Sequence, residues 1–443
     1  MICAAPLLRR FRRLLPAAAL AGLAFATPAH AQLGLPRVTT PTLPRELLPR
    51  VGTTTAPLGE TLQQGLGSLQ SLRLSAVRAL LRDHPDVLEA DPAGEPMRRG
   101  ELILASPAPA TVAAALDQGF ALLREQAWPE LDLREVVLRA PPGVPTAEAL
   151  RRLRAIDPQL EVDFNHLYTR SGEVKAAVTA AGAGPATGAR RVGLIDSGVE
   201  RGHVAFRGAE LRSWGCDDVA VPSPHGTAVA SLLIGHDAVF AGVATGSVLY
   251  AADIYCDRPG GGAVETIVQA LAWMDREQVG VVNISLVGPA NRLLERAARA
   301  MNQKGHLLVA AVGNDGPAAP PLYPASYPGV VGVTAVTPAR APLPEAAQGP
   351  QVMFAAPGAE LAVARSAGGY VAARGTSFAA PLVAGLLAAA LPAPDPALAL
   401  SALQRVADQA IDLRAPGRDP VFGIGLVGES ARVAPDRVQA RAR

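Results

Sequence analysis

Short apolar runs alternate with amphipathic segments through the C-terminal half of the chain. Helical spacing of apolar positions predicts helices over residues 226–234, 264–275, 291–304 and 377–391. Between these segments, buried strands are predicted for residues 192–195, 248–254, 279–284, 307–311 and 330–336. Apolar strands that alternate with helices indicate a doubly wound α/β domain, with a mostly parallel sheet and helices on both faces. We place this domain at residues 191–434, followed by a C-terminal tail over residues 435–443.

The region before this domain has a different pattern. Short strands are predicted for residues 100–105, 120–126, 133–138 and 161–167, and helices for residues 109–118 and 146–156. The order β-α-β-β-α-β is that of a small α+β, ferredoxin-like domain. An amphipathic helix is predicted before it, from residue 60 to residue 83. We therefore assign residues 60–168 to one unit, and the Gly- and Ala-rich residues 169–190 to a linker.

The N-terminal residues have the pattern of an export signal. Four arginines within residues 9–13 precede an apolar run over residues 14–26, and Ala29-His30-Ala31 gives the small-x-small cleavage pattern. The run is too short to span a bilayer comfortably, and no later segment predicts a transmembrane helix. We expect residues 1–31 to direct export to the periplasm or beyond, followed by a Pro/Thr-rich linker over residues 32–59. The alternative is a cytosolic protein whose start is wrongly assigned.

Composition narrows the range of partners. Lys and Arg number 41 against 39 Asp and Glu, so no charge excess favours nucleic acid or an anionic membrane surface. The hydrophobic fraction of 49% is ample for a folded core. Cys3 would leave with the export signal, and the remaining pair, Cys216 and Cys256, predicts a disulfide in an oxidising compartment. Two separate reduced thiols are the alternative.

Three polar residues stand where apolar elements begin or end. Asp196 directly follows a predicted strand, and His225 directly precedes a predicted helix. Ser377 opens a helix that is apolar on all sides, where backbone N–H groups and the helix dipole favour a developing oxyanion. Each alone has an ordinary explanation as a turn residue, a structural histidine or a helix cap. Together they supply the nucleophile, the base and the orienting carboxylate that acyl transfer needs.

On these residues the chain resembles the subtilisin-like serine proteases, or subtilases. The three matching segments follow the family's order, and the resemblance covers about residues 190–434: Asp196-Ser197-Gly198, His225-Gly226-Thr227 and Gly375-Thr376-Ser377-Phe378-Ala379-Ala380-Pro381. The resemblance implies that Asp196 orients His225 and that His225 acts as general base and then as general acid. It also implies that Ser377 attacks the scissile carbonyl.

Further segments match the family's oxyanion hole and the edges of its cleft. Residues 310–316 place Asn314 at the oxyanion-hole asparagine, whose amide would donate to the oxyanion beside the backbone N–H of Ser377. One edge of the cleft would be formed by Ser285, Leu286, Val287 and Gly288, and the opposing edge by Gly261 and Gly262. A peptide substrate would lie between the edges as an added strand. A core strand and an ordinary loop are the alternative.

Some positions depart from the family's commonest form. Leu382 and Ala228 stand where histidines are frequent, but neither belongs to the triad. Leu322 lies near the base of the primary specificity pocket, where a glycine is common, so we expect a shallow pocket that favours small or medium side chains. No clear acidic cluster matches the family's calcium sites, so no cofactor and no metal ligand is assigned.

The ferredoxin-like domain resembles in layout the propeptide domains of subtilases, which assist folding and inhibit the enzyme. We therefore expect a serine endopeptidase that cleaves polypeptides through an acyl-enzyme and is made as a self-processing zymogen. Its own propeptide would act in cis, with residues 165–172 passing through the cleft and cut by Ser377. A retained accessory domain is the alternative.

Two other functions stay open at this point. One is a hydrolase of non-peptide esters, although no G-x-S-x-G elbow surrounds Ser377. The other is a non-catalytic secreted binding protein on the same scaffold, although all four catalytic positions are filled.

Overall fold

The computed structural model describes residues 73–170, 172–178, 190–414 and 416–440. The expected export signal, the Pro/Thr-rich linker and the first part of the predicted helix over residues 60–83 lie outside these residues. Residues 73–83 are helical, as predicted. None of the helices within the described ranges is long and apolar enough to cross a membrane.

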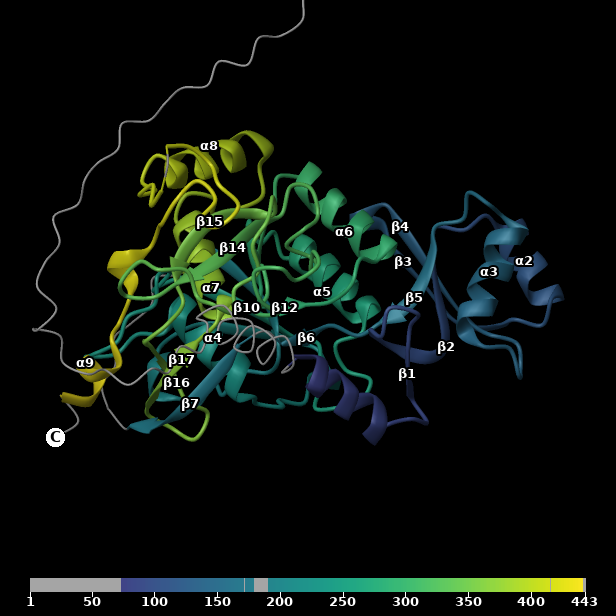
Figure 1. The fold of residues 1–443 in the computed structure, drawn as a ribbon, viewed down its shortest axis with the longest axis horizontal. Helices are drawn as coiled ribbons and strands as arrows, with labels where there is room; N and C mark the ends of the chain where they lie inside the picture. Colours follow the sequence, from purple (N-terminus) through teal and green to yellow (C-terminus); the bar gives the residue numbers. More distant parts are fainter. Residues whose placement is uncertain (1–72, 171, 179–189, 415, 441–443) are drawn as a thin grey trace, which may run out of the picture. The chain divides into compact units, whose positions relative to one another are not determined.

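A seven-stranded parallel sheet lies at the centre of the larger domain (Figure 1). All neighbouring strands in it are parallel. From one edge to the other, the strands are β15 (Val352–Pro357), β14 (Val331–Val336), β13 (Leu307–Ala311), β11 (Val281–Ile284), β8 (Arg191–Asp196), β10 (Val248–Asp253) and β9 (Leu211–Trp214). The two outermost strands, β15 and β9, are additional to the five predicted from the sequence.

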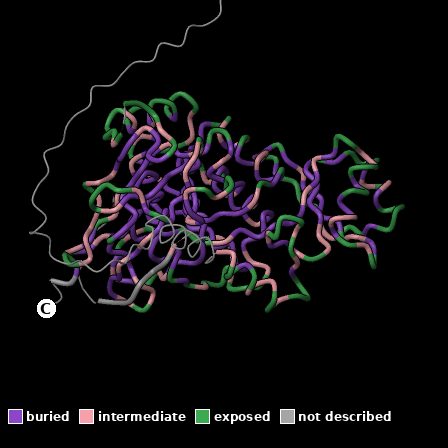
Figure 2. The backbone as a smooth tube through the Cα atoms, in the orientation of Figure 1, coloured by how far each residue is buried: buried purple, intermediate pink, exposed green. Residues whose placement is uncertain are grey.

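Helices cover both faces of this sheet. One face carries α4 (Pro224–Ile234) and α7 (Thr376–Ala388), and the other carries α5 (Val264–Arg276) and α6 (Arg292–Gln303). In β13, Val309 and Ala311 pack in the core that contains α4 and α7, whereas Leu308 and Ala310 pack in the core that contains α5 and α6. This alternation is the two-residue period of a strand. Apart from the edge strand β9, in which Arg212 and Ser213 are exposed, the strands are therefore buried along most of their length (Figure 2). The predicted doubly wound α/β fold is confirmed.

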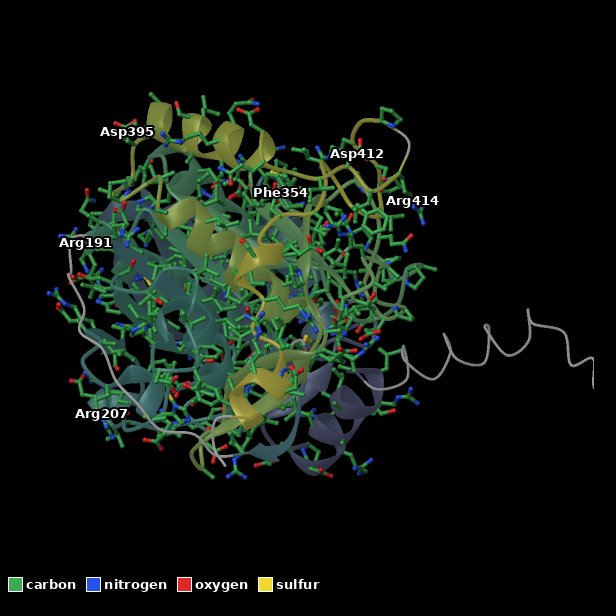
Figure 3. All side chains as sticks on the ribbon, turned by 90° about the vertical axis from the view of Figure 1, so that its left-hand side faces the viewer. Arg191, Arg207, Phe354, Asp395, Asp412 and Arg414 are labelled. Atoms are coloured by element: carbon green, nitrogen blue, oxygen red, sulfur yellow. A yellow bond between two sulfur atoms is a disulfide. The ribbon has the colours of Figure 1, made fainter. Side chains whose placement is uncertain are left out.

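The C-terminal part of the domain packs outside this framework. A hairpin consists of β16 (Leu361–Ala364) and β17 (Tyr370–Arg374), and α8 (Pro396–Ala407) follows. The carboxylate of Asp395 caps α8 by accepting from the N–H groups of Ala397 and Leu398. Asp395 and Arg414 lie at the periphery, whereas Phe354 on β15 lies within the fold (Figure 3).

The C-terminus differs from the prediction. Residues 435–440 form the helix α9 (Pro435–Ala440) rather than a simple tail. Val438 on this helix is 2% exposed and belongs to the same core as α4 and α7. The helix is short and carries one buried apolar residue, so its sequence has no helical period to detect.

The smaller N-terminal domain has the predicted order of elements. These are β2 (Pro96–Ala105), α2 (Pro109–Asp117), β3 (Ala121–Trp128), β4 (Leu133–Arg139), α3 (Thr146–Ile156) and β5 (Val162–His166). An additional strand, β1 (Leu88–Ala90), pairs with β2. The sheet is antiparallel in the order β1-β2-β4-β3, with β5 also paired to β2. Short 3-10 helices of the chain are η1 (Pro129–Leu131), η2 (Val204–Phe206), η3 (Cys216–Asp218) and η4 (Glu429–Ala431).

The two faces of the N-terminal sheet serve different cores. Leu102 and Val136 pack with α2 and α3 in the domain's own core. Ile103, Val137 and Trp128 belong instead to the core that contains α5 and α6 of the larger domain. The sheet therefore lies between two pairs of helices, and its second face is buried only because the larger domain covers it.

The segment after β5 is not the simple linker that its Gly and Ala content predicts. Residues 169–170 form β6 (Thr169–Arg170), which pairs antiparallel with β12 (Leu286–Val287). Residues 173–178 form β7 (Glu173–Val178), which pairs antiparallel with β17. The N–H and C=O groups at the edges of the larger domain supply partners for this backbone, and composition alone does not reveal such partners. Residues 179–189 lie outside the described residues.

Candidate active site

Asp196 and His225 meet at the carboxyl edge of the parallel sheet. Asp196 is the last residue of β8, and His225 lies in the first turn of α4. The Nδ1 atom of His225 is 2.9 Å from Oδ1 of Asp196. Both side chains are buried, the carboxylate completely. Carboxyl ends of strands are where open α/β sheets place their ligand-binding and catalytic groups, and a carboxylate at this distance fixes which imidazole nitrogen carries the proton.

Ser197 supports this pair, although the sequence analysis gave it no role. Its hydroxyl donates to Oδ1 of Asp196 at 2.9 Å and accepts from the backbone N–H of Gly226 at 3.1 Å. A Cβ atom on Gly226 would lie 2.0 Å from the carbonyl oxygen of Ser197, so only glycine fits there. The sequence indicated this contact only indirectly, because Ser197 belongs to the aspartate motif and Gly226 to the histidine motif.

Ser377 lies in the first turn of α7, as predicted. Pro381, four residues later, has no N–H, so it cannot donate to the Ser377 carbonyl as a helix normally would. The hydroxyl of Ser285 donates to that carbonyl instead, at 3.0 Å. The hydroxyl of Ser377 in turn lies 3.3 Å from the carbonyl oxygen of Ser285 and donates to it. Ser285 thus holds the start of α7 against the end of β11.

The histidine also approaches the start of α7. The ring centroid of His225 is 5.5 Å from that of Phe378, the residue that follows Ser377. The structure therefore brings Asp196 and His225 into direct contact and places the imidazole beside the N-terminal turn that carries Ser377.

Asn314 lies beside the same turn. Its Oδ1 accepts from the backbone N–H of Thr376 at 3.0 Å, which orients the amide with Nδ2 as its donor end. A Cβ atom on Gly375 would be 3.2 Å from Nδ2, and the φ of Gly375 is 132°. The hydroxyl of Thr376 accepts from the N–H of Gly313 at 3.3 Å. Thr376 thus ties the asparagine loop to the serine turn, a role that the sequence analysis did not assign.

The chain's own residues 167–170 occupy the predicted cleft. Leu167 forms a bridge with Ala263, and the N–H of Tyr168 donates to the carbonyl of Gly262 at 2.8 Å. On the other side, β6 pairs with β12. This segment therefore lies between the two predicted edges as an added strand.

Beyond β6, the chain reaches the serine turn. A Cβ atom on Gly375 would be 2.9 Å from Cα of Gly172, and one on Gly172 would be 2.8 Å from the ring of Phe378. Arg170 therefore pairs with the cleft edge, and Gly172 lies against the turn and the helix that carry Ser377.

The predicted edge residues divide into several roles. Leu286 and Val287 pair with the occupying strand, and Gly262 accepts from it. Gly288 pairs with Tyr323 and lies against the ring of Tyr168, which a Cβ atom would approach to 2.6 Å. Gly261 makes a tight turn, because a Cβ atom there would lie 2.3 Å from the carbonyl oxygen of Tyr255.

Leu322 lies against Gly313, close to the predicted edge residue Val287. It is 3% exposed, and its Cδ1 is 2.6 Å from the position of a Cβ atom on Gly313. Cγ1 of Val287 is 3.6 Å from the same position. Leu322 and Val287 therefore fill the space in front of Gly313, next to Asn314.

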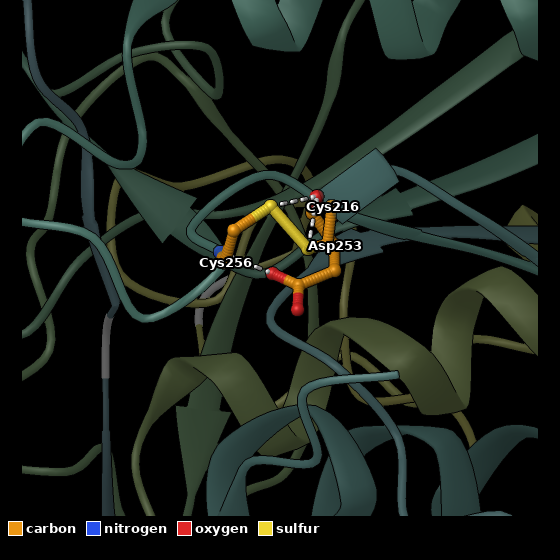
Figure 4. A group of neighbouring side chains, drawn as sticks. All are labelled: Cys216, Asp253 and Cys256. Carbon is orange, nitrogen blue, oxygen red and sulfur yellow. Dashed lines mark hydrogen bonds between the residues drawn. A yellow bond between two sulfur atoms is a disulfide. The ribbon is translucent and has the colours of Figure 1, made fainter. Parts of the chain in front are cut away.

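Cys216 and Cys256 form a disulfide (Figure 4), with their Cα atoms 5.1 Å apart. With Asp253 they are the one group of His, Cys, Asp or Glu side chains in the described ranges whose ligand atoms are close enough to share a metal ion. Both sulfurs are bonded to each other, so the group offers no thiolate to a metal. We assign no metal to it.

Charged side chains lie between the two domains. Arg98 and Arg124 of the N-terminal sheet both bind Glu265 at the start of α5, and Arg124 also binds Glu101 at 2.5 Å. A second carboxyl of the sheet, Glu135, is 2% exposed. Burial and the negative charge of Glu265 raise the pKa of Glu135 to about 8.

A third contact reaches the asparagine loop. Nε of Arg73, in the helix over residues 73–83, is 2.6 Å from Oδ2 of Asp315, and Nη1 is 3.0 Å from Oε2 of Glu95. Burial raises the pKa of Asp315, and the guanidinium of Arg73 opposes that effect. These interdomain contacts join residues far apart in the sequence, which is why the sequence analysis did not find them.

Comparison with known proteins agrees with the geometry. The chain is 32% identical over 222 residues to the minor extracellular protease Epr of Bacillus subtilis, with 49% of this chain and 34% of that protein covered. It is 31% identical over 207 residues to a subtilisin of Bacillus pumilus, with 45% of this chain and 75% of that protein covered. The chain thus spans about a third of the length of the first relative and three quarters of the second.

A solved structure extends the likeness of the fold. The crystal structure of fervidolysin from Fervidobacterium pennivorans, described as a keratinolytic enzyme related to subtilisin, superposes with a TM-score of 0.63 and 18% identity. The superposition covers 80% of this chain and 62% of that one. The model of the subtilase family matches residues 189–425, more than half of the sequence. The chain belongs to the subtilase family.

Proposed function

We propose that this protein is an exported serine endopeptidase, made as a zymogen, in which Asp196, His225 and Ser377 form the catalytic triad. The observation that carries the proposal is the strand of the chain's own residues 167–170, held between two backbone edges and leading to the serine turn. A cleft that holds an extended peptide by main-chain hydrogen bonds is suited to polypeptides rather than to small esters. The name of the B. subtilis relative describes an extracellular protease, which agrees with the proposed export.

Each residue has a role that its position supports. His225 takes the proton from the Ser377 hydroxyl as that oxygen attacks the carbonyl, and then donates it to the leaving amine. Asp196, hydrogen-bonded to Nδ1, fixes the tautomer of the imidazole and stabilises the imidazolium. Nδ2 of Asn314 and the N–H of Ser377 donate to the oxyanion. His225 then takes a proton from a water molecule, which attacks the acyl-enzyme and releases the acyl group.

The N-terminal domain is the propeptide in this proposal. It buries one sheet face against α5 and α6, and its C-terminal strand fills the cleft. Self-processing cuts the peptide bond between Ser171 and Gly172, because Arg170 still pairs with Leu286, Gly172 already lies against Phe378, and a small residue before the cut suits the pocket that Leu322 fills. The domain blocks the cleft until that bond is cut and the strand leaves.

A single substitution tests this function. The wild-type full chain should yield a shortened product whose new N-terminus lies after Arg170, and that product should hydrolyse casein. Ser377→Ala should remain uncut and inactive and should lose labelling by a fluorophosphonate. Ser401→Ala is the matched control, because Ser401 is exposed on α8, and it should behave as wild type. A normally shortened product from Ser377→Ala would rule out self-processing, and hydrolysis of short-chain esters but not of casein would rule out the peptidase.

A further inference from the structure

The guanidinium of Arg170 lies over an aromatic ring of the cleft. Its Cζ atom is 4.6 Å from the centroid of the Tyr255 ring, within the range of a cation–π interaction. Arg170 is the last residue of the occupying strand β6, and the bond that we expect to be cut follows the next residue. Tyr255 follows β10, on the edge opposite β12, so the side chain of Arg170 contacts the far edge while its backbone pairs with Leu286.

Tyr255 contacts the occupying strand at a second point. Its hydroxyl donates to the carbonyl oxygen of Tyr168 at 3.1 Å. The ring thus lies alongside the strand, fixed by a backbone contact that any peptide could make, and presents its face to one side chain. The backbone contact supplies general affinity, and the face of the ring supplies selectivity for the side chain above it.

A buried carboxylate binds the backbone of Tyr255. Asp253, the last residue of β10, is 8% exposed, and its Oδ1 accepts from the N–H groups of Tyr255 and Cys256 at 2.9 and 3.1 Å. Burial raises the pKa of Asp253, whereas the two backbone N–H groups and, to a smaller extent, the positive charge of Arg170 lower it. A cation above Tyr255 therefore adds to the stabilisation that these N–H groups give the carboxylate.

The turn that follows Asp253 and carries Tyr255 is held in place by a disulfide. The disulfide between Cys216 and Cys256 encloses the turn after β10, and both sulfurs lie 3.8 Å from the carbonyl oxygen of Asp253 (Figure 4). Tyr255 and Asp253 also border a cavity of about 610 Å³ that is lined in part by Asp217 and Asp218. The nearby cation of this loop, Arg258, is 2.9 Å from Asp217 and already ion-paired with it.

We propose that Tyr255 and Asp253 form a subsite that selects arginine or lysine in polypeptide substrates, at the position that Arg170 holds in the chain itself. The inference rests on the proposed peptidase function and specifies its substrate class. Arginine is preferred to lysine, because a planar guanidinium stacks on an aromatic face better than an ammonium. A neutral side chain makes neither the cation–π contact with Tyr255 nor the charge interaction with Asp253, and an acidic side chain is repelled by Asp253.

The test uses internally quenched peptides with the sequence of residues 165–174, Asn-His-Leu-Tyr-Thr-Arg-Ser-Gly-Glu-Val. The arginine is replaced by lysine, methionine or glutamate, and the full chain is allowed to process itself before kcat/KM is measured. The arginine peptide should exceed the methionine peptide by about tenfold, which corresponds to about 1.4 kcal/mol. Lysine should fall between them and glutamate below methionine.

Variants of the subsite should change this ratio. Tyr255→Leu removes the ring and should reduce the arginine-to-methionine ratio to about twofold or less, and Asp253→Asn should reduce it by removing the charge. Tyr255→Phe keeps the ring, so it should retain most of the ratio while kcat/KM falls for both peptides. Tyr250→Leu is the matched control: Tyr250 lies on β10 beneath a different arginine, Arg212, and this variant should keep the wild-type ratio.

The outcomes separate the two proposals. Casein hydrolysis that requires Ser377, together with equal kcat/KM for the arginine and methionine peptides, would overturn the subsite and leave the peptidase standing. An unchanged ratio in both Tyr255→Leu and Asp253→Asn would do the same. If the processed wild type cut neither casein nor any peptide, the peptidase and the subsite would both be wrong.

Discussion

The two sheets of this protein place their buried polar residues differently. In the parallel sheet, Asp196 and Asn283 stand near the carboxyl ends of strands, where each supports a serine or a histidine of the candidate site. In the antiparallel sheet, Glu101, Glu135 and Asn165 stand on the face that docks against the larger domain. Buried polar residues of the parallel sheet thus orient groups of the candidate site, and those of the antiparallel sheet attach one domain to the other.

The difference follows from how each sheet is covered. The parallel sheet is buried by its own helices on both faces, and the polar residues that support the candidate site stand at or near the ends of its strands. The N-terminal sheet has helices of its own on one face only. Its second face is completed by α5 and α6, and charged residues there can be exposed once the domains separate. Changes to the first set should therefore affect chemistry, and changes to the second set should affect docking.

Removal of the disulfide should have the largest effect on stability, and both of its cysteines lie in the larger domain. Cys216 and Cys256 are 40 residues apart, and closing a loop of that length lowers unfolded-state entropy by an amount equivalent to about 4 kcal/mol. Cys216→Ser with Cys256→Ser should reduce the free energy of unfolding by about that amount, measured by denaturant unfolding in the Ser377→Ala background to prevent self-digestion. Reduction of the unsubstituted disulfide should give a similar loss. A loss below about 1 kcal/mol would mean that the loop is ordered without the bond.

Asn314 sharpens the contrast, because Asn314 and Asn165 carry amides in the two different sheet regions. Asn314→Ala should lower kcat by about 10²–10³-fold, or about 2.7–4 kcal/mol, with little change in KM; the magnitude is the one found for this donor in subtilisin. Asn165→Ala is the matched control, because its amide donates to Glu101 in the docking face at 2.8 Å. That control should leave kcat of the processed enzyme unchanged and weaken docking. Equal losses of kcat in both variants would contradict the division of roles.

Glu135 tests the docking face through pH. Its pKa is about 8 in the docked state and near 4.5 when exposed, so docking takes up a proton between these values. The contribution of this carboxyl is therefore favourable below about pH 4.5 and is lost progressively as the pH rises to 8. Glu135→Gln should flatten this slope and stabilise the full-length Ser377→Ala chain at pH 9 by about 1–3 kcal/mol. Thermal unfolding from pH 5 to pH 9 measures it, and parallel pH profiles for the two chains would contradict the assignment.

The sequence predicted most of the candidate site because each of its residues carries a local signal. Asp196, His225 and Ser377 stand next to small residues at the ends of strongly apolar strands and helices. The spacing of apolar positions identifies those strands and helices in the sequence. Where the signal depends on a partner far away in the chain, prediction failed. The strands β6 and β7 lie in a stretch of low hydrophobicity and exist because β12 and β17 pair with them.

Supporting residues were missed for the same reason. Ser197 and Thr376 stand inside the motifs, but their hydrogen bonds to Gly226 and Gly313 follow from the folded geometry alone. The contact of Arg73 with Asp315 joins positions 242 residues apart. Helix α9 shows another limit, because a six-residue helix is defined by one buried side chain, Val438, and not by a repeating pattern.

Leu322 gives the smallest expected effect and the finest test of the cleft. Its side chain fills the space in front of Gly313, so a large side chain at the residue before the cut bond should fit poorly. Leu322→Ala should raise the ratio of kcat/KM for phenylalanine over alanine at that position by about tenfold, because each methylene of fit in such a pocket is worth about 1–3 kcal/mol. Leu382→Ala, a change of the same size in the core helix α7, should leave the ratio unaltered. Wild-type cleavage after phenylalanine or tyrosine as fast as after alanine would show that Leu322 does not limit the pocket.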